Sequence, residues 1–176
     1  MIGSPHHLAG LEKLSPPELL SLHAAIAEEL RRRNILRSSN NPTGDLAEYL
    51  CCRAFGWTQT GNATRDVDAI GADKLRYQIK ARRMTSHNKS PQLGALRDLP
   101  EKRFDFLVGV VFHEDYRVRR VAIVPHARVC EIATPVERTN SYRFLLRDSV
   151  WAFPDVRDAT AEVQAAEMEW ASELLK

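Results

Sequence analysis

Hydrophobic residues recur every three or four positions in three segments, which predicts three amphipathic helices. The first begins at the N-cap Ser15, where two prolines and an acid follow, and ends between Arg33 and Ile35. The second spans Gly44–Phe55 and stops at a glycine, and the last spans Thr160–Leu175. These helices frame a central part of the chain that has a different pattern.

In the central part, apolar and polar residues alternate in some segments and apolar residues follow one another without interruption in others, and both patterns are typical of strands. Residues 65–83, RDVDAIGADKLRYQIKARR, predict a β-hairpin with two acids on the first arm and Gln-x-Lys on the second. Phe104–Phe112 is almost entirely apolar, as expected for a strand that is covered on both faces. The order of elements predicts a mixed α/β domain with a central sheet flanked by helices. The remaining predicted elements are strands at Arg117–Val124 and Tyr142–Leu146 and short helices from Ser90 to Leu96 or Leu99 and from Pro125 to Ile132.

The two faces of the hairpin separate cleanly in only one register. A three-residue connection at residues 72–74 pairs Asp68 with Gln78 and Val67 with Ile79, so that one face is apolar. A two-residue connection would shift the pairing by one and mix the faces. The predicted polar face carries Asp66, Asp68, Gln78 and Lys80.

These polar side chains suit metal-assisted cleavage of a phosphodiester. A carboxylate such as Asp68 can hold Mg²⁺, which can polarise a phosphate and orient an attacking water. Lys80 can stabilise the attacking hydroxide or the charge that develops on phosphate. Glu48, on the preceding helix, can supply a second carboxylate. The alternative is an ordinary cross-strand ion pair that faces solvent.

Composition places few limits on this chemistry. The chain has 176 residues, of which 44% are hydrophobic and 27% charged, as is usual for a soluble protein with its own core. Three cysteines without a CxxC motif, and no apolar run near 18 residues, predict a cytoplasmic protein without a membrane span. We divide the chain into an N-terminal helical segment, residues 1–40, and an α/β domain, residues 41–176.

The net charge of +2 conceals a basic middle. Residues 73–103 contain nine Lys and Arg but only three Asp and Glu, so a polyanion would prefer this part of the molecule. Arg82 continues the second hairpin strand on the Lys80 side, and His87 and Lys89 follow in a polar loop. We predict that these three contact nucleic acid, the alternative being a solvated surface.

Four segments in a fixed order resemble the core of the PD-(D/E)xK nuclease superfamily. They are GDLAEYL, DVDAI, YQIKARR and FDFLVGVVF, and together they lie within Thr43–Val124, under half of the chain. That family places a helical acid before a β-hairpin that carries Asp and (Glu/Asp/Gln)-x-Lys, followed by a helix and further strands. The resemblance implies a restriction-endonuclease-like core with a central mixed sheet.

The resemblance also implies roles for individual residues. Glu48 matches the helical acid, Asp68 the metal-binding aspartate and Lys80 the catalytic lysine. In such sites the main-chain carbonyl between the last two motif residues, here Ile79, also faces the metal. The implied cofactor is Mg²⁺, with Mn²⁺ as a substitute.

Two positions depart from a simple match. Asp66 shares the predicted face of Asp68 and remains a rival metal ligand, although Asp68 stands directly opposite Gln78. Gln78 occupies the place of the usual second acid, and an amide brings no charge, so metal affinity should be weaker. Some members that resemble this chain keep Gln-x-Lys and cut DNA, with the helical acid supplying the charge, and others have lost catalysis.

The sequence therefore predicts a metal-dependent DNA endonuclease of restriction-like or repair-like type. The alternative is a catalytically inactive nucleic-acid-binding or regulatory module on the same fold, and a further one is a protein-interaction domain. The apolar stripe of the first helix can dock a second protomer, since cutting both strands needs two active sites; an amphipathic helix can equally be covered by its own domain.

Overall fold

The computed structural model describes residues 10–38, 41–61 and 66–173. The chain divides into two compact units, Met1–Pro42 and Thr43–Lys176. The first unit contains the 3₁₀ turn η2 (Leu11–Lys13) and the helix α1 (Pro16–Arg32). None of the described helices is long and apolar enough to cross a bilayer.

Helix α1 forms as the sequence predicts. Ser15 and Glu18 make a capping box, in which Glu18 accepts hydrogen bonds from the Ser15 backbone and hydroxyl. At the other end, hydrogen bonds from Arg32 and Arg33 lower the pKa of Glu29 to about 2. The arginines near the end of this helix are thus held by acids one turn earlier.

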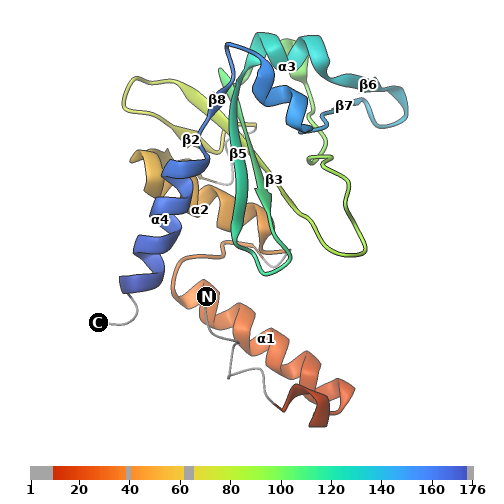
Figure 1. Cartoon of the computed structure of the whole chain (residues 1–176), viewed down its shortest axis with the longest axis vertical. Coiled ribbons are helices and arrows are strands. Elements are labelled where there is room, and N and C mark those ends of the chain that lie inside the picture. The colour runs from red at the N-terminus through yellow and green to blue at the C-terminus, as the bar shows by residue number, and fades with distance from the viewer. Residues whose placement is uncertain (1–9, 39–40, 62–65, 174–176) are drawn as a thin grey trace. The chain divides into compact units, whose positions relative to one another are not determined.

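The second unit is an α/β structure built on a six-stranded mixed sheet with strand order β1-β2-β3-β4-β5-β8 (Figure 1). Among the strand pairs in the described ranges, only β3–β4 is parallel. The helices are α2 (Thr43–Phe55), α3 (His126–Ile132) and α4 (Thr160–Glu173), with 3₁₀ turns η3 (Leu99–Glu101), η4 (Glu137–Thr139) and η5 (Asp148–Ala152). The strands are β1 (Thr58–Gln59), β2 (Ala69–Ile70), β3 (Arg76–Arg83), β4 (Phe106–Phe112), β5 (Val118–Pro125), β6 (Thr134–Val136), β7 (Ser141–Arg143) and β8 (Arg157–Asp158).

Both faces of the sheet are covered, as the apolar run in β4 predicts. Helices α2 and α4 contact each other and lie over β3 and β5 on one face (Figure 1). The other face is covered by α3 and by two irregular segments, residues 90–101 and 142–150. The buried cluster on that face comprises Leu93, Leu96, Leu99, Phe104, Leu107, Val111, Ala122, Val124, Val129, Phe144, Leu146 and Val150.

The predicted hairpin register is confirmed where the strands pair. Ala69 lies opposite Tyr77 and Ile70 opposite Arg76, the register produced by a three-residue connection. The first arm is shorter than predicted, however, because β2 has only two residues. Asp66 adopts a left-handed conformation with φ of 61°, so strand alternation does not extend to it.

The helix predicted from Ser90 to Leu96 or Leu99 is wrong. This segment is extended and forms isolated bridges to the chain near β7, with Leu93 N donating to Phe144 O at 3.0 Å. Leu96 and Tyr142 exchange backbone hydrogen bonds of 3.0 and 2.7 Å. The leucine spacing resembles a helix, but backbone groups satisfied by a distant segment decide the conformation. The strand predicted at Tyr142–Leu146 is correspondingly shorter, and three short strands, β1, β6 and β8, were not predicted.

An ion pair fixes the start of the parallel β3–β4 pair. Arg76 Nη2 lies 3.0 Å from Asp105 Oδ1, and the backbone N of Arg76 donates to Asp105 Oδ2 at 2.9 Å. In return, Asp105 N donates to Arg76 O at 2.8 Å. The hydrogen bonds from the Arg76 side chain lower the pKa of the Asp105 carboxyl.

We expect Asp105→Asn to lower the free energy of unfolding at pH 7 by about 1–2 kcal/mol, since Arg76 is partly exposed to solvent. A lowered folded-state pKa stabilises the protein above the unfolded-state pKa of about 4, and this contribution disappears as pH falls through the folded-state value. Urea unfolding at pH 7 and pH 3 measures the gap between variant and wild type. A gap that does not narrow between pH 7 and pH 3 would contradict the assignment, and Asp115→Asn, in an exposed turn, is the control.

Candidate metal and nucleic-acid site

The candidate site lies at the edge of β3, where β2 stops pairing with it. The last paired residue of β2 is Ala69, opposite Tyr77. One residue earlier, Asp68 Oδ2 accepts a hydrogen bond of 2.6 Å from the backbone N of Ile79. A carboxylate thus occupies the position at which the next backbone partner of β3 would stand.

This arrangement orients the Ile79 carbonyl as well. The N–H and C=O of one strand residue point toward the same neighbouring strand. Because the Ile79 N–H points to Asp68, its carbonyl oxygen faces the same side of β3. Asp68 and the Ile79 carbonyl, which the resemblance implies as two metal ligands, therefore lie on the same side of β3.

Gln78 is the least expected member of the site, because it is buried. Its side chain is 1% exposed, and its Nε2 donates to Asp66 Oδ1 at 3.3 Å. Its Oε1 has no hydrogen-bond partner among the described residues. Leaving a buried acceptor without a donor costs about 1–3 kcal/mol, so this oxygen is poised for a ligand.

Lys80 lies on the same face of β3 as Gln78, two residues further along. It stands opposite Gly109 of β4, and its Cδ lies 3.7 Å from the position that a Cβ of Gly94 would take. Two glycines thus border the half-buried lysine stem. Arg82 follows on this face and donates from Nε to Ser90 O at 3.2 Å.

Glu48 approaches from the other side of the sheet. It lies on α2, and its Oε2 accepts a hydrogen bond of 3.1 Å from Gln59 Nε2 of β1. Within the described residues, no three His, Cys, Asp or Glu side chains gather closely enough to hold a metal by themselves. A cation here therefore needs the amide and main-chain oxygens in addition to carboxylates.

The donor set fits a hard cation. Asp68, Gln78 Oε1 and the Ile79 carbonyl all offer oxygen atoms, the donors that Mg²⁺ prefers, and Mg²⁺ usually retains several waters. Asp66 is tied to Gln78 and lies 4.0 Å from Arg103, so its charge has a cation nearby. Asp68, whose carboxylate is fixed by the N–H of Ile79, remains the candidate ligand, with Asp66 as its rival.

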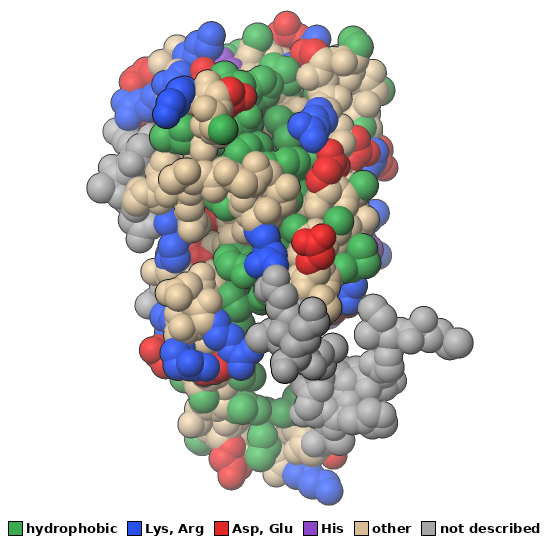
Figure 2. All heavy atoms as spheres, turned by 90° about the vertical axis from the view of Figure 1, so that its left-hand side faces the viewer, with side chains coloured by type: hydrophobic (Ala, Val, Ile, Leu, Met, Phe, Trp, Pro, Cys, Tyr) green, Lys and Arg blue, Asp and Glu red, His purple; other side chains and the backbone are tan. Residues whose placement is uncertain are grey.

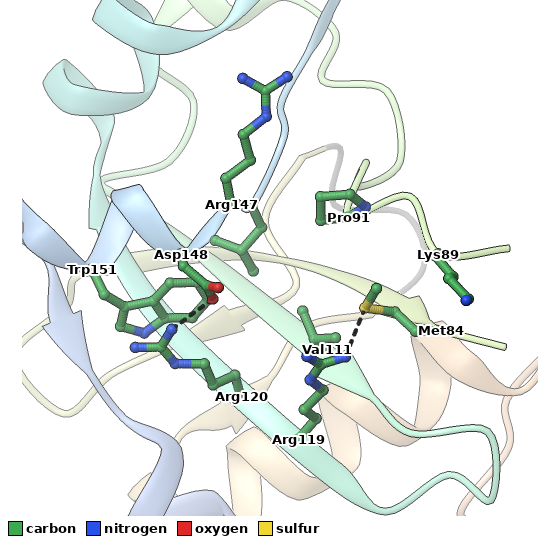
Figure 3. A pocket seen from close by; sticks show the side chains of 10 residues that line it. Met84, Lys89, Pro91, Val111, Arg119, Arg120, Arg147, Asp148 and Trp151 are labelled. Carbon is green, nitrogen blue, oxygen red and sulfur yellow. Dashed lines mark hydrogen bonds and ion pairs between the residues drawn. The ribbon is translucent and has the colours of Figure 1, made fainter. Parts of the chain in front are cut away.

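The predicted nucleic-acid contacts do not share one environment. His87 and Lys89 are exposed in the loop after β3. Lys89 lines a hollow that the sequence did not predict, together with three arginines from β5 and the segment before η5 (Figure 3). These arginines are Arg119, Arg120 and Arg147.

The hollow is predominantly basic. By contrast, acidic and basic side chains are interspersed on the side of the molecule that Figure 2 shows. Among the residues that line the hollow, four cations face a single acid, Asp148. The hollow was not predicted because its three arginines lie outside the basic stretch of residues 73–103. The sequence RVRR at the start of β5 was the only local signal.

The chain matches no protein-family model and none of the curated proteins with which it was compared. The assignment of the site therefore rests on its own geometry and on the order of its motifs.

We expect Gln78→Glu to destabilise the metal-free protein by about 1–3 kcal/mol, because it buries a carboxylate beside Asp66 and Asp68. A divalent cation should reverse this loss, so Mg²⁺ should raise the melting temperature of the variant more than that of wild type. Thermal unfolding in EDTA and in Mg²⁺ measures both effects. Gln92→Glu, an exposed position, controls for added charge; an equal response of all three proteins would contradict a metal site.

Proposed function

We propose that this chain is a metal-dependent DNA endonuclease that hydrolyses phosphodiester bonds. The observation that carries the proposal is the buried Gln78 Oε1, without a hydrogen-bond partner among the described residues, beside Asp68 and on the face of Lys80. A cation would satisfy that oxygen, and a phosphate would satisfy the lysine. The order of motifs, which resembles PD-(D/E)xK nucleases of restriction-like or repair-like type, supports the same activity.

Each residue has a separate task in this proposal. Asp68, Gln78 and the Ile79 carbonyl would hold Mg²⁺, or Mn²⁺ in its place, which when bound neutralises phosphate charge and activates water. Lys80 places a positive charge where negative charge develops on the phosphate. The hydrogen bond from Ile79 N fixes the Asp68 carboxylate, so little ordering is needed during reaction. Glu48 would add negative charge from α2 across the edge of the sheet.

A catalytically inactive nucleic-acid-binding module on this fold is the second candidate. It is favoured by the neutral Gln78 and by the fact that, over the described ranges, no three metal-binding His, Cys, Asp or Glu side chains cluster. Such a protein would bind DNA through its cations without turnover.

We expect Asp68→Asn and Lys80→Gln each to lower the rate of plasmid cleavage in Mg²⁺ or Mn²⁺ by about 100-fold or more. Asn retains an oxygen that can accept the Ile79 hydrogen bond, so a slower rate would report charge rather than folding. The assay follows supercoiled DNA into nicked and linear forms by gel electrophoresis.

Asp115→Asn and Lys74→Asn are matched controls, because both residues lie in exposed turns. Asn also tolerates the left-handed conformation of Lys74. Cleavage that survives both site substitutions would refute the assigned roles. DNA binding without cleavage in either metal would instead support the inactive module.

A further inference from the structure

The hollow in Figure 3 lies on the same sheet face as Gln78 and Lys80, two strands away. It has a volume of about 220 Å³ and opens to solvent between β5 and the segments that cover this face. Val111 forms part of its floor and stands between Arg82 of β3 and Arg120 of β5. The hollow therefore lies on the sheet face of Gln78 and Lys80, although neither of these residues lines it.

A β-bulge brings two consecutive arginines to this hollow. Val111 pairs with Arg120, but the next residue of β4, Phe112, pairs with Val118. Arg119 is the extra residue of the bulge, so the usual alternation of side chains is interrupted. Both arginines consequently line the same hollow rather than opposite faces of the sheet.

The cations of the hollow are held to different degrees. Arg120 is fixed, since it lies 2.9 Å from Asp148 Oδ1 and its guanidinium covers the Trp151 ring at 3.8 Å from the centroid. Arg119 Nη1 contacts only the Met84 sulfur, at 3.5 Å, as a side-chain partner within the described residues. Arg147 and Lys89 form no ion pair with another residue that lines the hollow. Their charge is available to an anion.

The shape and chemistry of the hollow indicate which part of a nucleic acid it would bind. Arg120 covers the Trp151 ring on one face, and the residues that line the hollow include no second aromatic ring to receive a base. Positive charges instead surround an open depression, which suits phosphate oxygens. Neighbouring strands are about 4.8 Å apart, so the Arg82 and Arg120 backbones are roughly 10 Å apart. That distance corresponds to a rise of about three nucleotides along the axis of B-form DNA.

We propose that this hollow binds the phosphate backbone of the DNA strand adjacent to the bond that is cut. Arg119 and Arg147 supply the charges that engage phosphate, and Arg120 forms the fixed wall. The identity of the polymer rests on the proposed nuclease function, but backbone binding does not require cleavage. Binding should therefore be independent of base sequence and strongly dependent on salt.

The test measures binding in the absence of metal, so that it does not depend on catalysis. Fluorescence anisotropy of a labelled DNA duplex in EDTA compares wild type with the double variant Arg119→Gln/Arg147→Gln. We expect affinity to fall about tenfold and the dependence of log K on log salt to flatten by about two, one for each arginine that no longer neutralises a phosphate.

The control is Arg138→Gln/Arg143→Gln, which removes the same charge from exposed positions outside the hollow. An equal fall in affinity for the two double variants, or no DNA binding by wild type, would overturn the proposal. If the double variant is destabilised in thermal unfolding, Arg147→Glu alone decides the matter, since this side chain is exposed. If Asp68→Asn abolishes cleavage while the Arg119/Arg147 variants bind DNA as wild type does, the nuclease is supported and the role of the hollow is refuted. If Asp68→Asn still cleaves while the Arg119/Arg147 variants lose DNA affinity, the role of the hollow is supported and the nuclease assignment is refuted.

Discussion

The absence of a side chain at Gly109 is the constraint on which this face of the sheet depends. A Cβ there would lie 2.7 Å from Leu146 Cδ2 and 3.2 Å from Leu93 Cδ1, so the covering segments approach the sheet more closely than any other residue would permit. Gly109 stands opposite Lys80. The segment of Leu93 places Gly94 beside the Lys80 stem, and the segment of Leu146 carries Arg147 to the hollow. One close contact therefore shapes both the surroundings of Lys80 and the cationic depression beside it.

The amide of Gln78 is buried, and its lack of charge affects both the stability of the metal-free protein and the proposed affinity for a cation. A carboxylate in its place would bury a charge next to Asp66 and Asp68 and would make the metal-free protein harder to fold. The neutral amide avoids that repulsion and can still offer an oxygen to a cation, at the cost of weaker attraction. In the proposed nuclease, Glu48 would add negative charge that attracts the metal, and the cations of the hollow would attract the nucleic acid. These charges come from neighbouring elements, α2 and the residues that line the hollow, and not from three clustered carboxylates.

The predictions from sequence were correct for features that depend on one element alone. The register of the hairpin followed from the period of two, and the doubly covered strand β4 followed from its apolar run. Sequence reasoning failed at residues 90–99, where leucines at helical spacing pair through their backbones with a segment about 50 residues later. It also placed Asp66 on a regular strand, although this residue turns into the left-handed region. The first error arises because the backbone partners are distant in sequence, and the second because β2 is too short to hold Asp66 in an extended conformation.

The sequence by itself determined that Gln78, Lys80 and Arg82 share one face of β3, because alternation along a strand is a local property of the backbone. Only the tertiary structure decided that Gln78 is buried, that Asp68 accepts a hydrogen bond from the N–H of Ile79 where β2 ends, and that Arg119, Arg147 and Lys89 line one hollow. These outcomes depend on where β2 ends, on the bulge in β5 and on the segment of Leu146 and Arg147, which covers this face of the sheet. Each is set by packing between residues far apart in the chain, which no local periodicity records.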